Sequence, residues 1–232
     1  MISLRKSADR GRSRLDWLDS RHSFSFGDYF DPKHVGFGPL RVINEDWVAP
    51  SQGFPTHGHR DMEIITYVLE GVLQHKDSLG NGSLIRPGDV QRMSAGHGVT
   101  HSEYNPSDRD TVHLLQIWIE PKFRGIRPGY EQKEFPADEK RGRLRIIASP
   151  DGRDGSVAIN QNATVMAALL APAERVEYPL AKGRSAYLHL VRGRIEANGT
   201  LLETGDAASL RDEDGVRIEA KEDSELLLFD LP

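Results

Sequence analysis

The chain contains no cysteine, and this absence excludes several kinds of site. Disulfides, thiolate zinc sites, iron–sulfur clusters and a cysteine nucleophile are all ruled out, and nothing indicates an oxidising compartment. We therefore expect a cytoplasmic protein. Any metal site in this chain must use nitrogen and oxygen donors.

Long hydrophobic runs and an excess of positive charge are also missing. The longest apolar segments, around residues 112–119 and 224–231, are far too short to cross a bilayer, so no membrane segment is expected. The formal net charge is −5, which disfavours direct binding to nucleic acid. The one basic stretch, residues 5–14, is interrupted by Asp9 and followed by Asp16 and Asp19. It predicts a solvated strand and loop and not a nucleic-acid arm or a transit peptide.

Convincing helical periodicity is scarce, whereas short runs typical of strands recur along the whole chain. Turn sequences separate these runs at short intervals, among them GNG at 80–82, PGD at 87–89 and TGD at 204–206. This rhythm predicts an all-β barrel or sandwich. The clearest expected strands are Leu40–Val48, Glu63–Leu69, Val112–Ile119, Leu144–Ala148, Ala186–Val191 and Glu225–Leu231.

The two halves of the chain resemble each other, which indicates a duplicated domain. The segment from Tyr67 to Ser94 is similar to the segment from Leu188 to Leu210, at an offset of roughly 120 residues. We expect an N-terminal domain at 1–130 and a C-terminal domain at 131–232. The connecting region, rich in charged residues, Gly and Pro, carries Phe123, Tyr130 and Phe135, so we expect a structured connector and not a flexible linker.

Two pairs of metal-ligand residues stand in the first half, each spaced i, i+2. His57 and His59 lie in THGH, and His101 and Glu103 lie in THSEYNP. Residues two apart in a strand project to the same face, so neighbouring strands can bring both pairs onto one ion. After His113 only His189 remains, so the second domain cannot repeat a three-histidine site. We expect a single metal site, in the first domain alone.

Three neutral imidazoles and one carboxylate suit divalent iron, manganese, nickel, copper or zinc, and Fe(II) is the first choice here. Four protein ligands would leave two positions of an octahedron for dioxygen and for a chelating or enolate substrate. The centre would carry a net charge of about +1, which favours a monoanionic oxygen donor.

Other polar and aromatic residues have a structural explanation as their first expectation. Glu63 is expected to make hydrogen bonds in the core or around the ligands, His75 with Asp77 to form a loop pair, and His97 to be a loop side chain near the site. Ordinary packing or surface roles are expected for His22, His34 and His113. Most of the N-terminal phenylalanines, Phe24, Phe26, Phe30 and Phe37, are expected in the core; Gly36 and Gly38 offer a loop that folds over a barrel mouth, and Phe54 is close to His57 in sequence.

No P-loop, dinucleotide fingerprint or G-x-S-x-G elbow is present, so metal chemistry is the one strong candidate. Several longer segments resemble the pirins, bicupin proteins of the cupin superfamily, and the likeness spans nearly the whole chain. The segments are WLDSRHSFSFGDYFDP, GFGPLRVINEDWVAPSQGF, HGHRDMEIITYVLEG, HKDSLGN, MSAGHGVTHSEYNP and LLQIWIEP.

This resemblance implies two tandem double-stranded β-helix (jelly-roll) barrels and one metal ion, usually iron, held by His57, His59, His101 and Glu103. It also implies a quercetin 2,3-dioxygenase, which uses dioxygen to open the central ring of a flavonol with release of carbon monoxide. In such an enzyme Glu103 is expected to serve as both ligand and catalytic base. The alternative is a non-enzymatic iron-binding regulator that binds a transcription factor or metabolic enzyme. A metal-dependent isomerase or hydrolase on the same scaffold is a third possibility.

Overall fold

The apolar runs of the sequence form strands along the whole chain in the computed structural model, which describes residues 1–232. All six expected strands are present, each within one residue of its predicted bounds, so the all-β prediction is confirmed. The six are β4 (Leu40–Val48), β6 (Glu63–Glu70), β11 (Val112–Ile119), β13 (Arg145–Ser149), β17 (Ser185–Arg192) and β22 (Ser224–Leu231). The single α-helix, α1 (Ala137–Lys140), has four residues, and no helix is long and apolar enough to span a membrane.

The strands belong to two compact units that are not contiguous in sequence. The N-terminal unit consists of Gly11–Glu134 with Val157–Gln161, and the C-terminal unit of Met1–Arg10, Phe135–Ser156 and Asn162–Pro232. This division differs from the expected domains 1–130 and 131–232, because the first ten residues belong with the C-terminal half. The cause is the pairing of β1 (Ile2–Arg5) with β20 (Ala207–Leu210).

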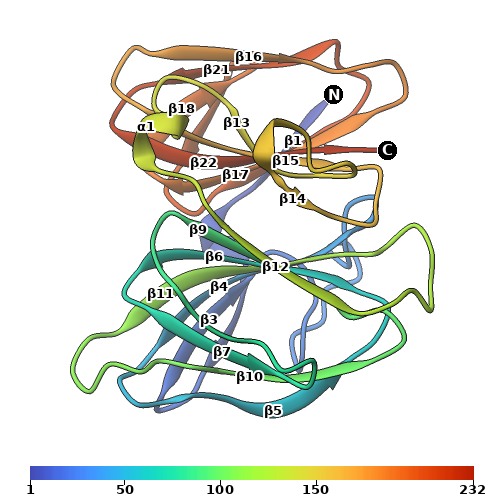
Figure 1. The fold of residues 1–232 in the computed structure, drawn as a ribbon. Coiled ribbons are helices and arrows are strands. Elements are labelled where there is room, and N and C mark those ends of the chain that lie inside the picture. The colour runs from blue at the N-terminus through green and yellow to red at the C-terminus, as the bar shows by residue number, and fades with distance from the viewer. The chain divides into compact units, whose positions relative to one another are not determined.

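Two sheets face each other in the N-terminal unit (Figure 1). The larger has the order β12-β9-β6-β11-β4-β3-β2, and the smaller has the order β5-β10-β7-β8. The remaining bounds are β2 (Gly11–Arg14), β3 (Leu18–His22), β5 (Gly53–His59), β7 (Leu73–Asp77), β8 (Gly82–Ile85), β9 (Asp89–Ser94), β10 (Val99–Tyr104), β12 (Gly129–Glu134) and β14 (Val157–Ala158).

The C-terminal unit repeats this arrangement. Its larger sheet includes the order β1-β20-β17-β22-β15-β13, and its smaller sheet has the order β16-β21-β18-β19. In this sheet β1 pairs with β20, just as β12 pairs with β9 in the N-terminal unit. The repeat seen in the sequence therefore corresponds to the same strand order in both units. The remaining bounds are β15 (Thr164–Leu170), β16 (Arg175–Pro179), β18 (Arg194–Ala197), β19 (Thr200–Glu203), β21 (Gly215–Ala220) and the 3-10 turns η1 (Ser7–Asp9) and η2 (Arg153–Gly155).

The repeated glycines have a physical cause at one pair of positions. Gly71 and Gly193 both adopt positive φ, at 76° and 91°. A Cβ on Gly71 would lie 3.0 Å from the carbonyl oxygen of Thr111, and one on Gly193 would lie 2.3 Å from that of Asp223. Both turns therefore require a residue without a side chain.

The interiors of the two barrels differ in chemistry. The C-terminal barrel has a continuous apolar core, and β16 and β21 contribute Val176, Tyr178, Val216 and Ile218 to it. In the N-terminal barrel one apolar cluster, which includes Leu18, Val68 and Leu114, occupies part of the interior. Beside it the same inner faces carry buried polar side chains: Ser20, His22, Asn44, Asp46, Thr66 and Gln116. Only the N-terminal barrel has the polar interior that a reactive site needs.

The basic N-terminal segment and the connector are only partly as expected. The segment does contain strand residues, the end of β1 and the whole of β2. However, Arg5 and Arg10 are each only 8% exposed, and Lys6 pairs with Asp206 at 2.8 Å, so the segment is not fully solvated. The connector is structured, with β12 and α1; Phe135 is buried and Phe123 is 63% exposed.

Candidate metal centre

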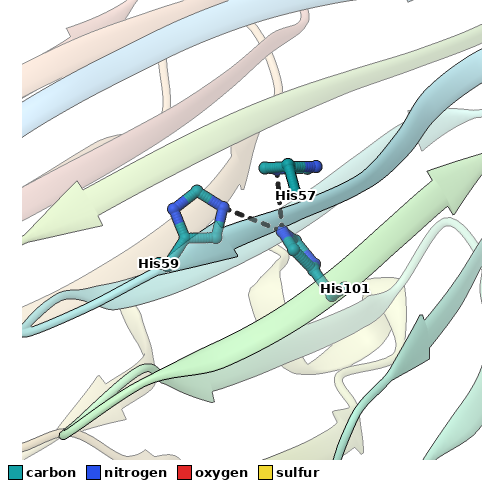
Figure 2. A group of neighbouring side chains, drawn as sticks. All are labelled: His57, His59 and His101. Carbon is teal, nitrogen blue, oxygen red and sulfur yellow. Dashed lines mark hydrogen bonds between the residues drawn. The ribbon is translucent and has the colours of Figure 1, made fainter.

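The predicted histidines come together on two neighbouring strands. His57 and His59 lie on β5 and His101 on β10, and the antiparallel register places His57 directly opposite His101. The Nε2 atom of His101 lies 2.9 Å from Nε2 of His59 and 3.1 Å from Nε2 of His57. Figure 2 shows the three rings converging from these two strands on a common point.

Glu103 is placed differently from the histidines. The register of β10 against β5 shifts between His101 and Glu103, so Glu103 lies opposite Phe54. The candidate ligand atoms of His57, His59 and His101 form one group within 4.8 Å of one another, whereas Glu103 is grouped with His101 and His75. Glu103 accepts hydrogen bonds from Gln116 Nε2 at 2.9 Å and from Thr66 Oγ1 at 3.4 Å. Glu103 therefore lies near His101 but outside the group formed by the three histidines.

Burial sets the charge of these groups. It lowers the pKa of His59 to about 4 and the pKa of His101 to about 3, with the neighbouring imidazoles contributing to both shifts. Burial also raises the pKa of Glu103 to about 7, despite the hydrogen bonds from Gln116 and Thr66. At neutral pH the imidazoles of His59 and His101 are therefore uncharged, which is the form that binds metal ions.

This donor set fits a divalent metal ion. Two nitrogens that bind one ion at about 2.1 Å, at right angles to each other, lie about 3 Å apart, which matches the spacing of the Nε2 atoms. The Nδ1 atom of His57 lies 2.8 Å from the carbonyl oxygen of Pro55, so it carries the proton and leaves Nε2 free. His57, His59 and His101 would hold the ion, with Glu103 as the carboxylate beside them.

A fourth histidine, His75, contacts the Nδ1 atom of His101, and an aspartate, Asp77, contacts His75. His75 Nδ1 lies 3.5 Å from His101 Nδ1, and His75 Nε2 lies 3.1 Å from Asp77 Oδ2. Asp77 also accepts hydrogen bonds from the backbone of Leu79 and from Asn81. One proton arrangement satisfies this whole chain: His101 donates to His75, and His75 donates to Asp77. That arrangement leaves Nε2 of His101 unprotonated and directed at the other two histidines.

The expectation that His75 and Asp77 form a loop pair is therefore wrong. Both residues lie on β7, and both side chains are fully buried. Their i, i+2 spacing carried the same information as His57 and His59, because it places both side chains on one face of a strand. The nearby GNG turn instead indicated a loop at these two positions.

We expect His75→Phe to weaken metal binding by about 10- to 100-fold while leaving the three predicted imidazole ligands in place. Loss of the acceptor at His75 Nδ1 frees the His101 ring to change tautomer and orientation. Competition against a chelator of known affinity measures the effect. Lys76→Gln is the matched control, because Lys76 lies between His75 and Asp77 but is exposed. Equal metal affinity for both variants would show that His75 does not orient His101.

Glu63 and the histidines outside the metal group have structural roles or lie in loops. Glu63 is fully buried and accepts hydrogen bonds from Ser94 Oγ at 2.8 Å and from Asn160, so the expected hydrogen-bonding role is confirmed. His97 is exposed in a loop, as expected. His113 packs as expected, stacked on Trp47 and hydrogen-bonded to Glu45 at 3.0 Å. His34 lies 3.9 Å from Asp31 at a half-buried position.

A cavity of about 270 Å³ opens onto the histidine group. Phe26, Phe54 and Trp118 give it aromatic walls. His22 also lines it, and its buried ring packs against Phe26 as expected. Phe24 and Phe37 are buried as expected, whereas Phe30 is 72% exposed. The full lining is Ser13, Leu15, Leu18, Ser20, His22, Phe26, Gly27, Asp28, Asn44, Asp46, Phe54, His57, His59, Ile64, His101, Glu103, Gln116 and Trp118.

Two tandem β-barrels, with a histidine group and an adjoining cavity in the first, define a metal-binding bicupin. Comparison with known families places the chain more closely. Residues 4–119 match the family model described as Pirin, and residues 146–231 match the model described as the quercetinase C-terminal cupin domain. The chain belongs to the pirin family, as its sequence motifs predicted.

Similar proteins cover the whole chain. The quercetin 2,3-dioxygenase of Escherichia coli strain K12 is 46% identical over 232 residues, covering 100% of this chain and 99% of its own. The crystal structure of YhhW from Escherichia coli matches with a TM-score of 0.97 at 46% identity, over 100% of this chain and 98% of its own. The structure of YhhW in complex with nickel(II) matches with a TM-score of 0.96, also at 46% identity, over 100% of this chain and 99% of its own.

Proposed function

We propose that this protein is a metal-dependent dioxygenase that cleaves the heterocyclic ring of flavonols such as quercetin and releases carbon monoxide. In the overall reaction both atoms of dioxygen enter the product, a depside, and carbon 3 of the flavonol leaves with its own oxygen as carbon monoxide. The observation that carries this proposal is the convergence of three imidazoles on a cavity with aromatic walls. The name of the Escherichia coli relative supports the same activity.

The proposed ligands are His57, His59, His101 and Glu103, and the proposed ion is Fe(II). The donor set also suits manganese, nickel, copper or zinc, and nickel(II) is the ion in the YhhW complex. A divalent ion held there supplies a positive centre that binds oxygen donors and favours the anionic form of a flavonol hydroxyl. In the C-terminal unit the corresponding strands, β16 and β21, carry no histidine. We therefore propose that the metal ion is bound by the N-terminal unit alone.

The protein's own residues supply binding and proton handling in this proposal. Phe26, Phe54 and Trp118 would pack against the flat rings of the substrate and keep water away from them. Glu103 is the proposed proton acceptor for the flavonol hydroxyl, because it is buried in the same cavity and its pKa is raised to about 7. Gln116 and Thr66 would hold its carboxylate in place.

The test is aerobic turnover of quercetin by iron-loaded protein, with loss of the flavonol absorbance and release of carbon monoxide measured together. We expect His57→Ala to abolish both, because it removes one of three converging nitrogens, and we expect His97→Ala to retain both, because His97 is exposed and outside the group. Consumption of quercetin without oxygen would favour an isomerase or hydrolase. No turnover at full metal occupancy would refute the dioxygenase and favour the iron-binding regulator with a protein partner.

A further inference from the structure

The larger sheet of the N-terminal unit carries a polar patch on its inner face that the metal centre does not use. Asn44 and Asp46 on β4 have the same orientation, and β3 places Ser20 directly opposite Asp46. All three line the cavity that contains the histidines. The residue between them, Glu45, takes the other face and pairs with His113. We call Ser20, Asn44 and Asp46 the polar wall.

The polar wall is buried but has incomplete hydrogen bonding. Asp46 is 4% exposed, and its one hydrogen bond is accepted by Oδ1 from Ser20 Oγ, so Oδ2 has no partner in the protein. Asn44 is 3% exposed; its Oδ1 lies 2.8 Å from His22 Nδ1, and its amide nitrogen has no partner. Both residues line the cavity, so a ligand bound there can supply the partners that these two atoms lack.

The polar wall combines an acceptor and a donor. Oδ2 of Asp46 can accept a hydrogen bond, and the amide nitrogen of Asn44 can donate one. Together they suit a hydroxyl group, which both donates and accepts.

The polar wall and the metal centre occupy different sheets. The wall comes from β3 and β4 of the larger sheet, and the histidines come from β5 and β10 of the smaller sheet. Trp118 and Phe26 add apolar ring surface to the same cavity. This cavity suits a molecule with an apolar, aromatic body and oxygen substituents at two separate places.

We propose that Ser20, Asn44 and Asp46 form a hydrogen-bonding subsite for a second oxygen substituent of the substrate, separate from the oxygen pair that reaches the metal. The inference rests on the proposed function and narrows it: the preferred substrate is a flat aromatic compound with at least one hydroxyl group beyond that pair. The wall selects among aromatic ligands, and the histidines do not.

The test compares two ligands in the iron-loaded protein without oxygen, so that neither is consumed. Quercetin carries further hydroxyl groups, whereas 3-hydroxyflavone has the same metal-binding oxygen pair and no other hydroxyl. We expect the unmodified protein to prefer quercetin by about tenfold or more, which one to two good hydrogen bonds supply. Asp46→Ala should remove most of that preference by weakening quercetin alone, with 3-hydroxyflavone changed by less than about twofold. Quenching of tryptophan fluorescence and calorimetry both measure these affinities.

Two further variants provide an independent test of the subsite and a matched control. Asn44→Ala should reduce the same preference independently, so the inference stays testable if Asp46→Ala does not fold. Glu45→Gln is the matched control, since it changes a buried carboxyl on the same strand but on the opposite face, and it should keep the preference for quercetin. A preference that survives both Asp46→Ala and Asn44→Ala would overturn the subsite while leaving the dioxygenase in place. Unmodified protein that binds neither flavonol and shows no aerobic turnover would overturn the proposed function and the subsite with it.

Discussion

Glu103→Gln should lower quercetin turnover by about 100-fold or more while leaving the barrel folded. The amide has nearly the shape of the carboxyl group and can still accept the hydrogen bond from Gln116. It provides no negative charge to the proposed ion and cannot take a proton, and general-base catalysis alone contributes about 100- to 10,000-fold. Turnover of the iron-loaded variant and its metal affinity measure the two effects separately.

Glu63→Gln is the matched control for this variant. Glu63 is also a fully buried glutamate of the N-terminal unit, but its carboxylate accepts hydrogen bonds from Ser94 and Asn160 and lies outside both ligand groups. We expect it to unfold at a lower temperature, because charge-assisted hydrogen bonds are lost, yet to bind metal and turn over quercetin normally. Full activity in Glu103→Gln would refute the base role. Full activity with weak metal binding would separate the role of ligand from that of base.

Gly53→Ala should destabilise the protein by about 3 kcal/mol and weaken metal binding. A Cβ at Gly53 would lie 2.2 Å from the carbonyl oxygen of Glu103 and 2.6 Å from Cα of Tyr104, so β5 and β10 would have to separate at the register shift. Overpacking of this kind typically costs about 1–3 kcal/mol, and here both contacts are with backbone atoms that cannot rotate away. Thermal unfolding should show a decrease of roughly 10 °C, at about 2–4 °C per kcal/mol for a chain of this size.

Gly58→Ala, on the same strand, separates this clash from a general effect of replacing glycine. A Cβ at Gly58 would meet nothing nearer than 3.8 Å, and Gly58 has no positive φ. Its stability should stay within about 0.5 kcal/mol of the unmodified protein. If Gly53→Ala and Gly58→Ala unfold at the same temperature, then the close approach at Gly53 does not hold the two strands in register.

The sequence predicted strands better than it predicted the order in which they pair. Runs such as Val112–Ile119 are apolar on both faces, and only a buried strand of that length accommodates them. The pairing of β1 with β20 has no local cause, because it depends on contacts between residues about 200 positions apart. Nothing in the composition of Ile2–Arg5 distinguishes a strand that joins the distant half from one that joins its neighbours.

The site was predictable where ligand chemistry coincides with strand periodicity. His57, His59 and His101 converge because residues two apart share a face. The register shift that separates Glu103 from His57 lies beside the close approach at Gly53, and no pattern of ligand residues encodes it. Gln116, Thr66 and Asp46 were missed for another reason: as single polar residues in apolar strands, they are identifiable only when the sheet register aligns them.

The pairing of β1 with β20 also constrains the order of events during synthesis. Residues 2–5 are translated about 200 residues before their partners, residues 207–210. The N-terminal barrel likewise waits for Val157–Gln161, the segment that brings Asn160 to Glu63. Contacts this distant in sequence form slowly, and until β20 is translated β1 has no partner strand and can pair with other chains. Nascent chains should therefore depend on chaperones until β20 is made, long after the metal-ligand residues have been translated.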